Sequence, residues 1–507
     1  MNPSYPAVGE LYAQALNLYT RETAIVDGER RLSYDELRGR MHQLLAAFDK
    51  IGLGPGSTLG LALNTSGDFV ELVLATYIAG LTLVELNPAL PWEMVEHRVR
   101  LSGADAVLVR ASDYPAETLA RFGGLACPAY AVGGEGGDLQ PLPQPASAAS
   151  GALIPRLSDA PGGIYFTSGS TGLPKGFPVP ASAPASQALL TMMTVNHPVR
   201  PVSVLAMTHP TVMHMLLTPT ILRGGCVVTV PSPDLDKVVG AAKANGANML
   251  FMPTRMLYTL LDQGDTDWMK AQLELFYYGG ENMTVERLTE AIRICGPIFA
   301  QTFGTAESGP SGLLRPEDHN LDTPEILGSL GRPIIGMDMQ IRDENGAELP
   351  PNQPGYLYIK SPGAMLEYIG QPEKTRDTLI DGWVCPGDVG SKDERGFFYF
   401  LDRDTFALKV DGKTLYPRKV EMHLGKAPAI KEVVAMAVEI DGESRLCIAV
   451  QQRGGDSLTK EEVAALVDGE YGVSPYRVLF VESIPLNPVS RKLDRPAIEG
   501  MFRNSAS

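Results

Sequence analysis

A loop rich in hydroxyl and glycine residues follows a short apolar segment at 163–166, which predicts a buried strand. Hydroxyl groups and glycine N–H groups can converge on phosphate oxygens, and Lys175 adds a positive charge. The loop is not a Walker loop, because Pro174 precedes the lysine and no Ser or Thr follows it to open a helix. A Gly/Ser loop by itself is more often a surface turn. The candidate phosphate-binding residues are Thr167, Ser168, Gly169, Ser170, Thr171, Gly172 and Lys175.

The complete string 167–176 resembles the signature of the adenylate-forming superfamily. This superfamily comprises acyl- and aryl-CoA synthetases, adenylation domains of peptide synthetases and firefly-type luciferases. The resemblance begins at 32–37 (Leu-Ser-Tyr-Asp-Glu-Leu), continues through Leu86-Asn87-Pro88 and extends to the end of the chain. It implies ATP, Mg²⁺ and coenzyme A as cofactors and a carboxylic acid as the small-molecule substrate.

Two further segments resemble superfamily motifs around the adenine and the metal. In 303–307 the resemblance implies that Phe303 lies near adenine, Thr305 contacts phosphate and Glu307 holds Mg²⁺. A carboxylate suits a hard cation that bridges phosphates. Segment 278–281 resembles the part that lines the adenine and acyl pockets, where glycine lets the backbone approach a flat ligand. The implied ligand-binding residues of both segments are Phe303, Gly304, Thr305, Glu307, Gly279, Gly280 and Glu281.

Segment 381–390 is similar to the superfamily's ribose motif. The resemblance implies that Asp388 accepts hydrogen bonds from both ribose hydroxyls, which an ionised carboxylate can do. Pro386 stands where a threonine is usual. Arg403 falls on the arginine expected to reach ribose or phosphate, and Thr405 stands where the hinge Asp or Lys usually lies.

Two segments near the carboxyl terminus resemble those that serve the two halves of the reaction. Segment 408–421 is similar to the one that enters the site for thioester formation, with Lys409 and Gly412 as coenzyme A contacts. Segment 485–495 resembles the element with the catalytic lysine of adenylation, which falls on Lys492, and Arg491 replaces the usual glycine. A mobile ammonium could bridge the attacking carboxylate and the α-phosphate as charge builds up.

The acyl pocket is the least specific part of the resemblance. His209 or His214 falls where related CoA ligases place a gate, although a histidine in an apolar run is more often a core residue. We take His209 as the candidate gate and assign it a catalytic role. Apolar neighbours favour an aromatic or medium-chain aliphatic acid. The candidate pocket residues are His209, Met213, Phe276, Tyr277 and Gly279.

The implied reaction has two steps, formation of an acyl-adenylate with loss of pyrophosphate and thioester formation with coenzyme A, which releases AMP. Too little sequence follows Lys492 for a carrier domain, so we expect a diffusible acceptor or a separate partner. The alternative is a stand-alone adenylating enzyme that passes the activated group to an amine, a carrier protein or another nucleophile. A nucleotide-binding protein without catalysis is disfavoured by the retained Lys175, Glu307, Asp388, Arg403 and Lys492.

The elements that must position these residues alternate between helix and strand. Helices are predicted at 34–45, 69–79 and 95–102, and strands at 58–63 and 106–109. This order predicts an α/β fold with a largely parallel sheet. The Gly/Pro/Ala/Ser-rich stretch 131–161 predicts a surface loop inside the large domain, and 235–261 predicts a second α/β subdomain.

Beyond about residue 330 the pattern predicts a β-rich module, with strands at 339–342, 355–360 and 396–401. The last hundred residues predict a small α/β domain with helices at 419–424 and 460–471 and strands at 433–440 and 446–451. We therefore expect a large N-terminal domain over 1–403, made of two α/β subdomains plus the β-rich module. A small mobile C-terminal α/β domain should cover 404–507.

Composition limits the partners. With 43 basic and 59 acidic residues the formal charge is −16, and no Lys/Arg-rich run occurs, so nucleic acid is a poor partner. The longest apolar stretch, 72–84, is shorter than the ~18–20 residues of a membrane span, and 1–16 lacks a targeting pattern. Five scattered cysteines without metal spacing fit a reducing cytoplasm. A homodimer and a carrier-protein partner stay open.

Overall fold

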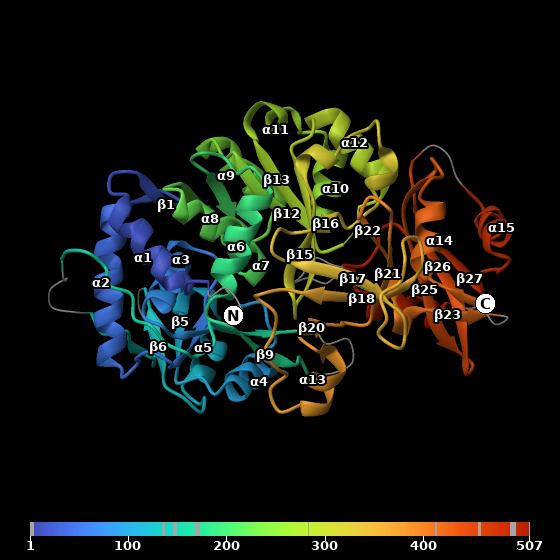
Figure 1. Cartoon of the computed structure of the whole chain (residues 1–507). Coiled ribbons are helices and arrows are strands. Elements are labelled where there is room, and N and C mark those ends of the chain that lie inside the picture. Colours follow the sequence, from blue (N-terminus) through green and yellow to red (C-terminus); the bar gives the residue numbers. More distant parts are fainter. Residues whose placement is uncertain are drawn as a thin grey trace.

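The computed structural model describes residues 5–133, 137–144, 150–167, 173–281, 283–410, 413–454, 458–486 and 493–505. Figure 1 shows the C-terminal elements, in red, together at one end of the molecule, and the first helices, in blue, toward the other. The mixed architecture of helices and several sheets confirms the predicted α/β class. In the described part of the chain, no helix combines the length and apolarity that a membrane crossing requires.

The first sheet has seven strands in the order β7-β6-β5-β3-β4-β8-β9, all parallel except the antiparallel pair β8 and β9. Its strands are β3 (Thr58–Ala62), β4 (Thr82–Glu85), β5 (Ala106–Arg110), β6 (Ala129–Val132), β7 (Gln140–Pro141), β8 (Gly163–Phe166) and β9 (Gly176–Val179). Its helices are α2 (Tyr34–Lys50), α3 (Gly67–Ile78), α4 (Trp92–Ser102) and α5 (Ala116–Phe122). The predicted loop 131–161 contains β7, which adds an edge strand to this sheet.

The second sheet has nine strands in the order β16-β15-β14-β13-β12-β10-β11-β1-β2. Its strands are β1 (Thr23–Asp27), β2 (Arg30–Ser33), β10 (Val202–Leu205), β11 (Cys226–Thr229), β12 (Met249–Pro253), β13 (Leu275–Gly279), β14 (Phe299–Thr305), β15 (Gly309–Leu314) and β16 (Arg332–Pro333). Its helices are α6 (Ala183–Thr194), α7 (Pro210–Val212), α8 (Thr218–Leu222), α9 (Leu235–Asn245), α10 (Thr254–Gln263), α11 (Asp267–Gln272) and α12 (Val285–Cys295). The N-terminal pair β1 and β2 completes the sheet next to β11, a long-range pairing that the local pattern did not indicate.

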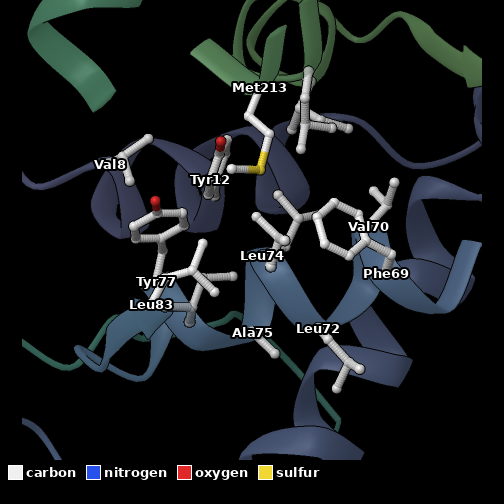
Figure 2. Packing of buried hydrophobic residues seen from close by; sticks show 14 of the residues in the cluster. Val8, Tyr12, Phe69, Val70, Leu72, Leu74, Ala75, Tyr77, Leu83 and Met213 are labelled. Carbon is white, nitrogen blue, oxygen red and sulfur yellow. The ribbon is translucent and has the colours of Figure 1, made fainter. Parts of the chain in front are cut away.

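A hydrophobic core joins the two large sheets. Helix α1 (Val8–Leu18) packs beside α3, which is buried at every residue except Asp68 and contributes Phe69, Leu72 and Leu74. Figure 2 shows Met213, from the π-helical segment Met213–Leu217, reaching this core next to Tyr12. Burial of these side chains fixes the orientation of the two sheets and therefore of the loops at their edges.

The β-rich module is a six-stranded sheet in which β17 pairs with β18. Its elements are β17 (Asp338–Arg342), β18 (Gly355–Lys360), α13 (Pro372–Thr378), β19 (Leu379–Ile380), β20 (Trp383–Val384), β21 (Asp388–Lys392) and β22 (Phe398–Arg403). The strands that the pattern predicted at 339–342 and 355–360 are confirmed.

The last part of the chain forms a hairpin and a three-stranded sheet covered by helices. Its elements are β23 (Leu408–Val410), β24 (Lys413–Leu415), α14 (Pro417–Leu424), β25 (Ile430–Ile440), β26 (Glu443–Gln452), α15 (Lys460–Tyr471), β27 (Arg477–Phe480) and α16 (Arg495–Asn504). Helix α15 has the predicted limits because Thr459 and Glu462 form a reciprocal capping box at its start. The domain boundary at 403–404 stays a prediction.

Candidate active site

Glu307 lies at the tip of a hairpin between β14 and β15. Thr305 pairs with Gly309, so the connecting loop has three residues and is followed directly by Gly309, whose φ is +66°. Ser308 ties the loop together, because its hydroxyl accepts a hydrogen bond from the Thr305 N–H at 3.1 Å. At Gly304 an added Cβ would lie 2.0 Å from the Gly309 carbonyl oxygen, so the hairpin requires glycine there. The tip therefore presents the carboxylate in a fixed position.

Lys175 and Glu307 meet at a tyrosine that the sequence analysis did not single out. The Tyr368 hydroxyl donates to Glu307 Oε1 at 2.5 Å, and the Lys175 ammonium lies 4.0 Å from the centre of the Tyr368 ring. Partial burial lowers the pKa of Lys175, and the Glu307 carboxylate opposes this shift. The segment with Tyr368 runs beside β9, where the Ile369 N–H donates to the Gly176 carbonyl. The sequence analysis did not find Tyr368, since its place beside Lys175 depends on this long-range pairing.

The two ends of the candidate phosphate loop lie next to each other. The Thr167 N–H donates to the Lys175 carbonyl at 3.0 Å, and the Lys175 N–H donates to Thr167 Oγ1 at 3.4 Å. These bonds place both residues at the carboxyl end of β8, an edge where ligands often bind α/β sheets. Ser168, Gly169, Ser170, Thr171 and Gly172 lie outside the described residues.

Asp388 begins β21 and pairs with Arg403 at the end of β22. The Arg403 Nε–H donates to Asp388 Oδ1 at 3.2 Å, and the aspartate side chain is 6% exposed while the arginine is 52% exposed. Burial raises the pKa of Asp388, and the Arg403 charge opposes the shift. The charge of Glu307 acts on Asp388 as well, and the charge of Arg403 acts on Lys175, so the two pairs belong to one cluster.

The segment after β13 approaches the neighbouring strand closely. At Gly279 an added Cβ would lie 2.7 Å from the Thr302 carbonyl oxygen, and Gly280 has φ +89°. Glu281 follows at once and accepts a hydrogen bond from Arg255 Nε at 2.9 Å. It also accepts from the backbone N–H of Leu493 at 2.8 Å, which brings the C-terminal part of the chain to this segment.

The candidate acyl-pocket residues occupy different surroundings. His209 is exposed and caps α7, with its Nδ1 accepting from the Thr211 N–H at 3.3 Å. Met213 and Tyr277 are buried in the core between the large sheets. Phe276 lies on the opposite face of β13, because neighbouring strand residues alternate, and it packs on Phe299. Their assignment to the acyl pocket stays a prediction.

The remaining predicted residues fall in three places. Phe303 is half-buried and packs against the β-rich module. Lys409 is exposed on β23. Gly412 and Lys492, the residues predicted for coenzyme A and for adenylation, lie outside the described residues.

A buried polar network next to this site was only partly indicated by the sequence. The Tyr165 hydroxyl lies 3.2 Å from His214 Nε2, and His214 Nδ1 contacts the Gln187 side chain. Burial lowers the pKa of His214 to about 3, so the ring is neutral at ordinary pH. His214 thus lies in the interior as a hydrogen-bonded core residue, whereas His209 lies at the surface.

Comparison with known proteins agrees with this geometry. The model of the family described as AMP-binding enzyme matches residues 12–369, which hold the phosphate loop, the Glu307 hairpin and the Glu281 segment. The chain belongs to this family. The superfamily indicated by the sequence motifs is thereby confirmed, and the protein is an adenylate-forming, ATP-using enzyme.

Similarity to individual proteins extends over nearly the whole AMP-binding enzyme described here. The chain is 26% identical to the medium/long-chain-fatty-acid–CoA ligase FadD8 of Mycobacterium tuberculosis, over 98% of this chain and 90% of that protein. It is 26% identical to the fatty acid–[acyl-carrier-protein] ligase ScoC of Streptomyces coeruleorubidus, over 95% and 94%. The structure of the amide bond synthetase McbA of Marinactinospora thermotolerans matches with a TM-score of 0.86 at 25% identity, over 98% and 100%.

Glu307 of this AMP-binding enzyme has the surroundings that a magnesium ion requires. Among the described residues no group of three or more His, Cys, Asp or Glu could form an all-protein cage. Magnesium does not need one, because it is commonly held by one or two carboxylates together with substrate phosphates. Glu307 keeps one oxygen that no described side chain binds, and Lys175 stands close by for the phosphates. The residues present therefore fit Mg²⁺.

Proposed function

We propose that the protein is an AMP-forming acid–CoA ligase that activates an aromatic or medium-chain aliphatic carboxylic acid. The observation that carries the proposal is the convergence of Lys175, Glu307, Asp388 and Arg403, which come from four different segments. Two cations and two carboxylates in one partly buried cluster match the needs of a magnesium nucleotide. The similarity to fatty-acid–CoA ligase FadD8 supports the acyl class.

In the first step, a carboxylate oxygen of the substrate attacks the α-phosphorus of ATP, and the bond to the β-phosphate oxygen breaks. Pyrophosphate leaves and the acyl-adenylate remains. Both reactants are anions, so catalysis consists mainly of alignment and charge neutralisation. Lys175 and Arg403 supply fixed positive charge, Asp388 orients the ribose, and Lys492 bridges the attacking carboxylate and the α-phosphate. Magnesium held by Glu307 would neutralise phosphate charge.

In the second step, the thiol of coenzyme A attacks the acyl carbon. The bond between that carbon and the AMP oxygen breaks, AMP leaves and the thiol proton passes to solvent. The C-terminal domain, proposed to begin at 404, would rotate to withdraw Lys492 and to present Lys409 and Gly412 to the pantetheine arm. His209, exposed at the start of α7, would gate entry to the acyl group.

A second acceptor class has specific support. ScoC is a ligase that acts with an acyl carrier protein, and McbA is an amide bond synthetase. We therefore keep a carrier protein or an amine as the alternative acceptor in place of coenzyme A. Adenylation is the same in both cases, so only the second step separates them.

The experiment that tests the proposal incubates purified protein with ATP, Mg²⁺ and a panel of aryl, medium-chain and long-chain acids. Each reaction is run with and without coenzyme A, and products are identified by mass. AMP together with an acyl-CoA is the expected result and identifies the acid class. AMP or acyl-adenylate without thioester would overturn the coenzyme A assignment. Nucleotide binding without pyrophosphate exchange for any acid would overturn the ligase reaction.

A further inference from the structure

Arg255 on α10 lies between two carboxylates that belong to distant parts of the chain. Its Nε–H donates to Glu281 at 2.9 Å, and its Nη1 contacts Glu432 on β25. The three side chains are only 13%, 19% and 16% exposed, respectively. The guanidinium therefore links the segment after β13 to the sheet of the C-terminal part.

A second ion pair of opposite polarity lies beside the first. Asp262 on α10 pairs with Lys431 on β25 at 2.8 Å. Positions 255 and 262 are seven apart and share one face of the helix, so both pairs join the same two elements. Helix α10 contributes one cation and one anion to these two pairs, and β25 contributes one of each. This reciprocal arrangement specifies how β25 sits against α10.

Glu281 also receives the Leu493 backbone N–H at 2.8 Å. Leu493 follows the predicted adenylation lysine, Lys492, directly in the sequence. One carboxylate of the candidate nucleotide segment is therefore held by Arg255 on one side and by the C-terminal part on the other. Any movement that separates β25 from α10 must break the Arg255–Glu432 and Asp262–Lys431 ion pairs.

Ion pairs suit a contact that opens and closes. Separating a buried apolar contact exposes hydrocarbon to water, and that cost is not recovered. When a partly buried ion pair separates, each charge regains its hydration, so the net cost of opening is small. Removing only one partner is different, because the remaining charge is left partly dehydrated without compensation.

We propose that Arg255 is a positioning residue that fastens β25, through Glu432, to Glu281 and so holds the protein in the arrangement for adenylation. This inference rests on the proposed two-step function. Opening of the Arg255–Glu432 and Asp262–Lys431 contacts is then the event that releases the C-terminal part for the transfer step. The contacts bias the enzyme toward the first half-reaction and leave its chemistry to other residues.

The test uses the full chain with Glu432→Gln, which keeps the shape of the side chain and removes its charge. Glu443→Gln is the matched control, because Glu443 pairs with Arg445 inside the same sheet and faces no part of the large domain in that pair. Pyrophosphate exchange should fall about tenfold in Glu432→Gln, and transfer from supplied acyl-adenylate should stay equal or rise. The control should change neither rate.

A distance measurement gives a readout that needs no activity. Spin labels on Val199→Cys and Glu461→Cys, both at exposed positions, report the separation of the two parts. Glu432→Gln should broaden the distance distribution relative to the otherwise unchanged chain, and Glu443→Gln should leave it narrow. Unchanged distances, or equal losses in both half-reactions, would overturn the role of Arg255. If the unmodified chain exchanges pyrophosphate with no acid, the proposed function fails. The distances between the two spin labels would still show whether the Arg255–Glu432 contact holds the C-terminal part in place.

Discussion

The two junctions of this protein are built from different contacts. Between the two large sheets, apolar packing surrounds a neutral network of Tyr165, His214 and Gln187, and nearby the Thr208 hydroxyl donates to the partly buried carboxyl of Glu85. Between the large sheets and the C-terminal part, two ion pairs join α10 to β25. The first junction would expose core on opening, whereas the second exposes charges that water solvates well. We infer that the first is permanent and the second detachable.

The largest expected effect falls on the half-reaction that needs the detachable junction closed. Lys492→Ala should lower pyrophosphate exchange about a thousandfold, because a positioned charge on the transition state is lost. Transfer from supplied acyl-adenylate should stay within about twofold, since Lys492 is proposed to be withdrawn in that step. Rapid-quench measurement of each half-reaction checks this. Equal losses in the two steps would contradict the alternation of the C-terminal part.

The junction between the two large sheets can be tested through the effect of Glu85 on the pH dependence of the free energy of unfolding. Burial raises the pKa of Glu85 from 4.5 to about 7, although Thr208 and Arg98 oppose the shift. Between those values the native state binds a proton that the unfolded state has lost, so the free energy of unfolding falls as pH rises. The loss amounts to about 3 kcal/mol.

Glu85→Gln cannot titrate and should lack this component. Urea unfolding of both proteins between about pH 5 and about pH 8 gives the comparison. The stability of the variant relative to the unmodified protein should rise across that interval. A parallel pH dependence in the two proteins would show that Glu85 is already ionised in the native state.

Asp388→Asn should affect both halves of the reaction, unlike changes at the detachable junction. The buried carboxylate, held by Arg403, is proposed to bind ribose in ATP and in the adenylate alike. Loss of its charge should raise the KM for ATP about tenfold, the size of one hydrogen bond to a charged group. Steady-state kinetics at varied ATP measure it. An unchanged KM would remove Asp388 from the ribose site.

The smallest expected effect comes from salt. Raising ionic strength from about 0.05 M to about 0.5 M should slow pyrophosphate exchange about twofold by screening the ion pairs of α10 and β25. Glu432→Gln should respond less, since one of the two pairs is already absent. Exchange rates along a salt series in both proteins make the comparison. The same salt dependence in both proteins would show that salt acts on charges other than the ion pairs of α10 and β25.

The local sequence pattern was enough to predict a helix or strand where the structure of that segment depends on its own residues. The limits of β8 and α15 match the prediction, because an apolar run and a capping box are both local signals. The hairpin of Glu307 was not predicted as such, yet its residues were named through their resemblance to a superfamily motif. The pairing of β1 with β11 and the edge strand β7 were missed, since strand partners far apart in sequence leave no local periodicity.

The sequence by itself determined the family, because its motifs resemble those of adenylate-forming enzymes, and it named Lys175, Glu307, Asp388 and Arg403 as candidates to bind phosphate, magnesium and ribose. Only the tertiary structure decided which of these four side chains lie close together and which other residues connect them. Tyr368 joins Lys175 to Glu307, and Arg255 joins Glu281 to Glu432, although the sequence analysis singled out neither residue. The physical reason is that a long-range contact depends on how whole sheets pack, and packing is a property of the complete core.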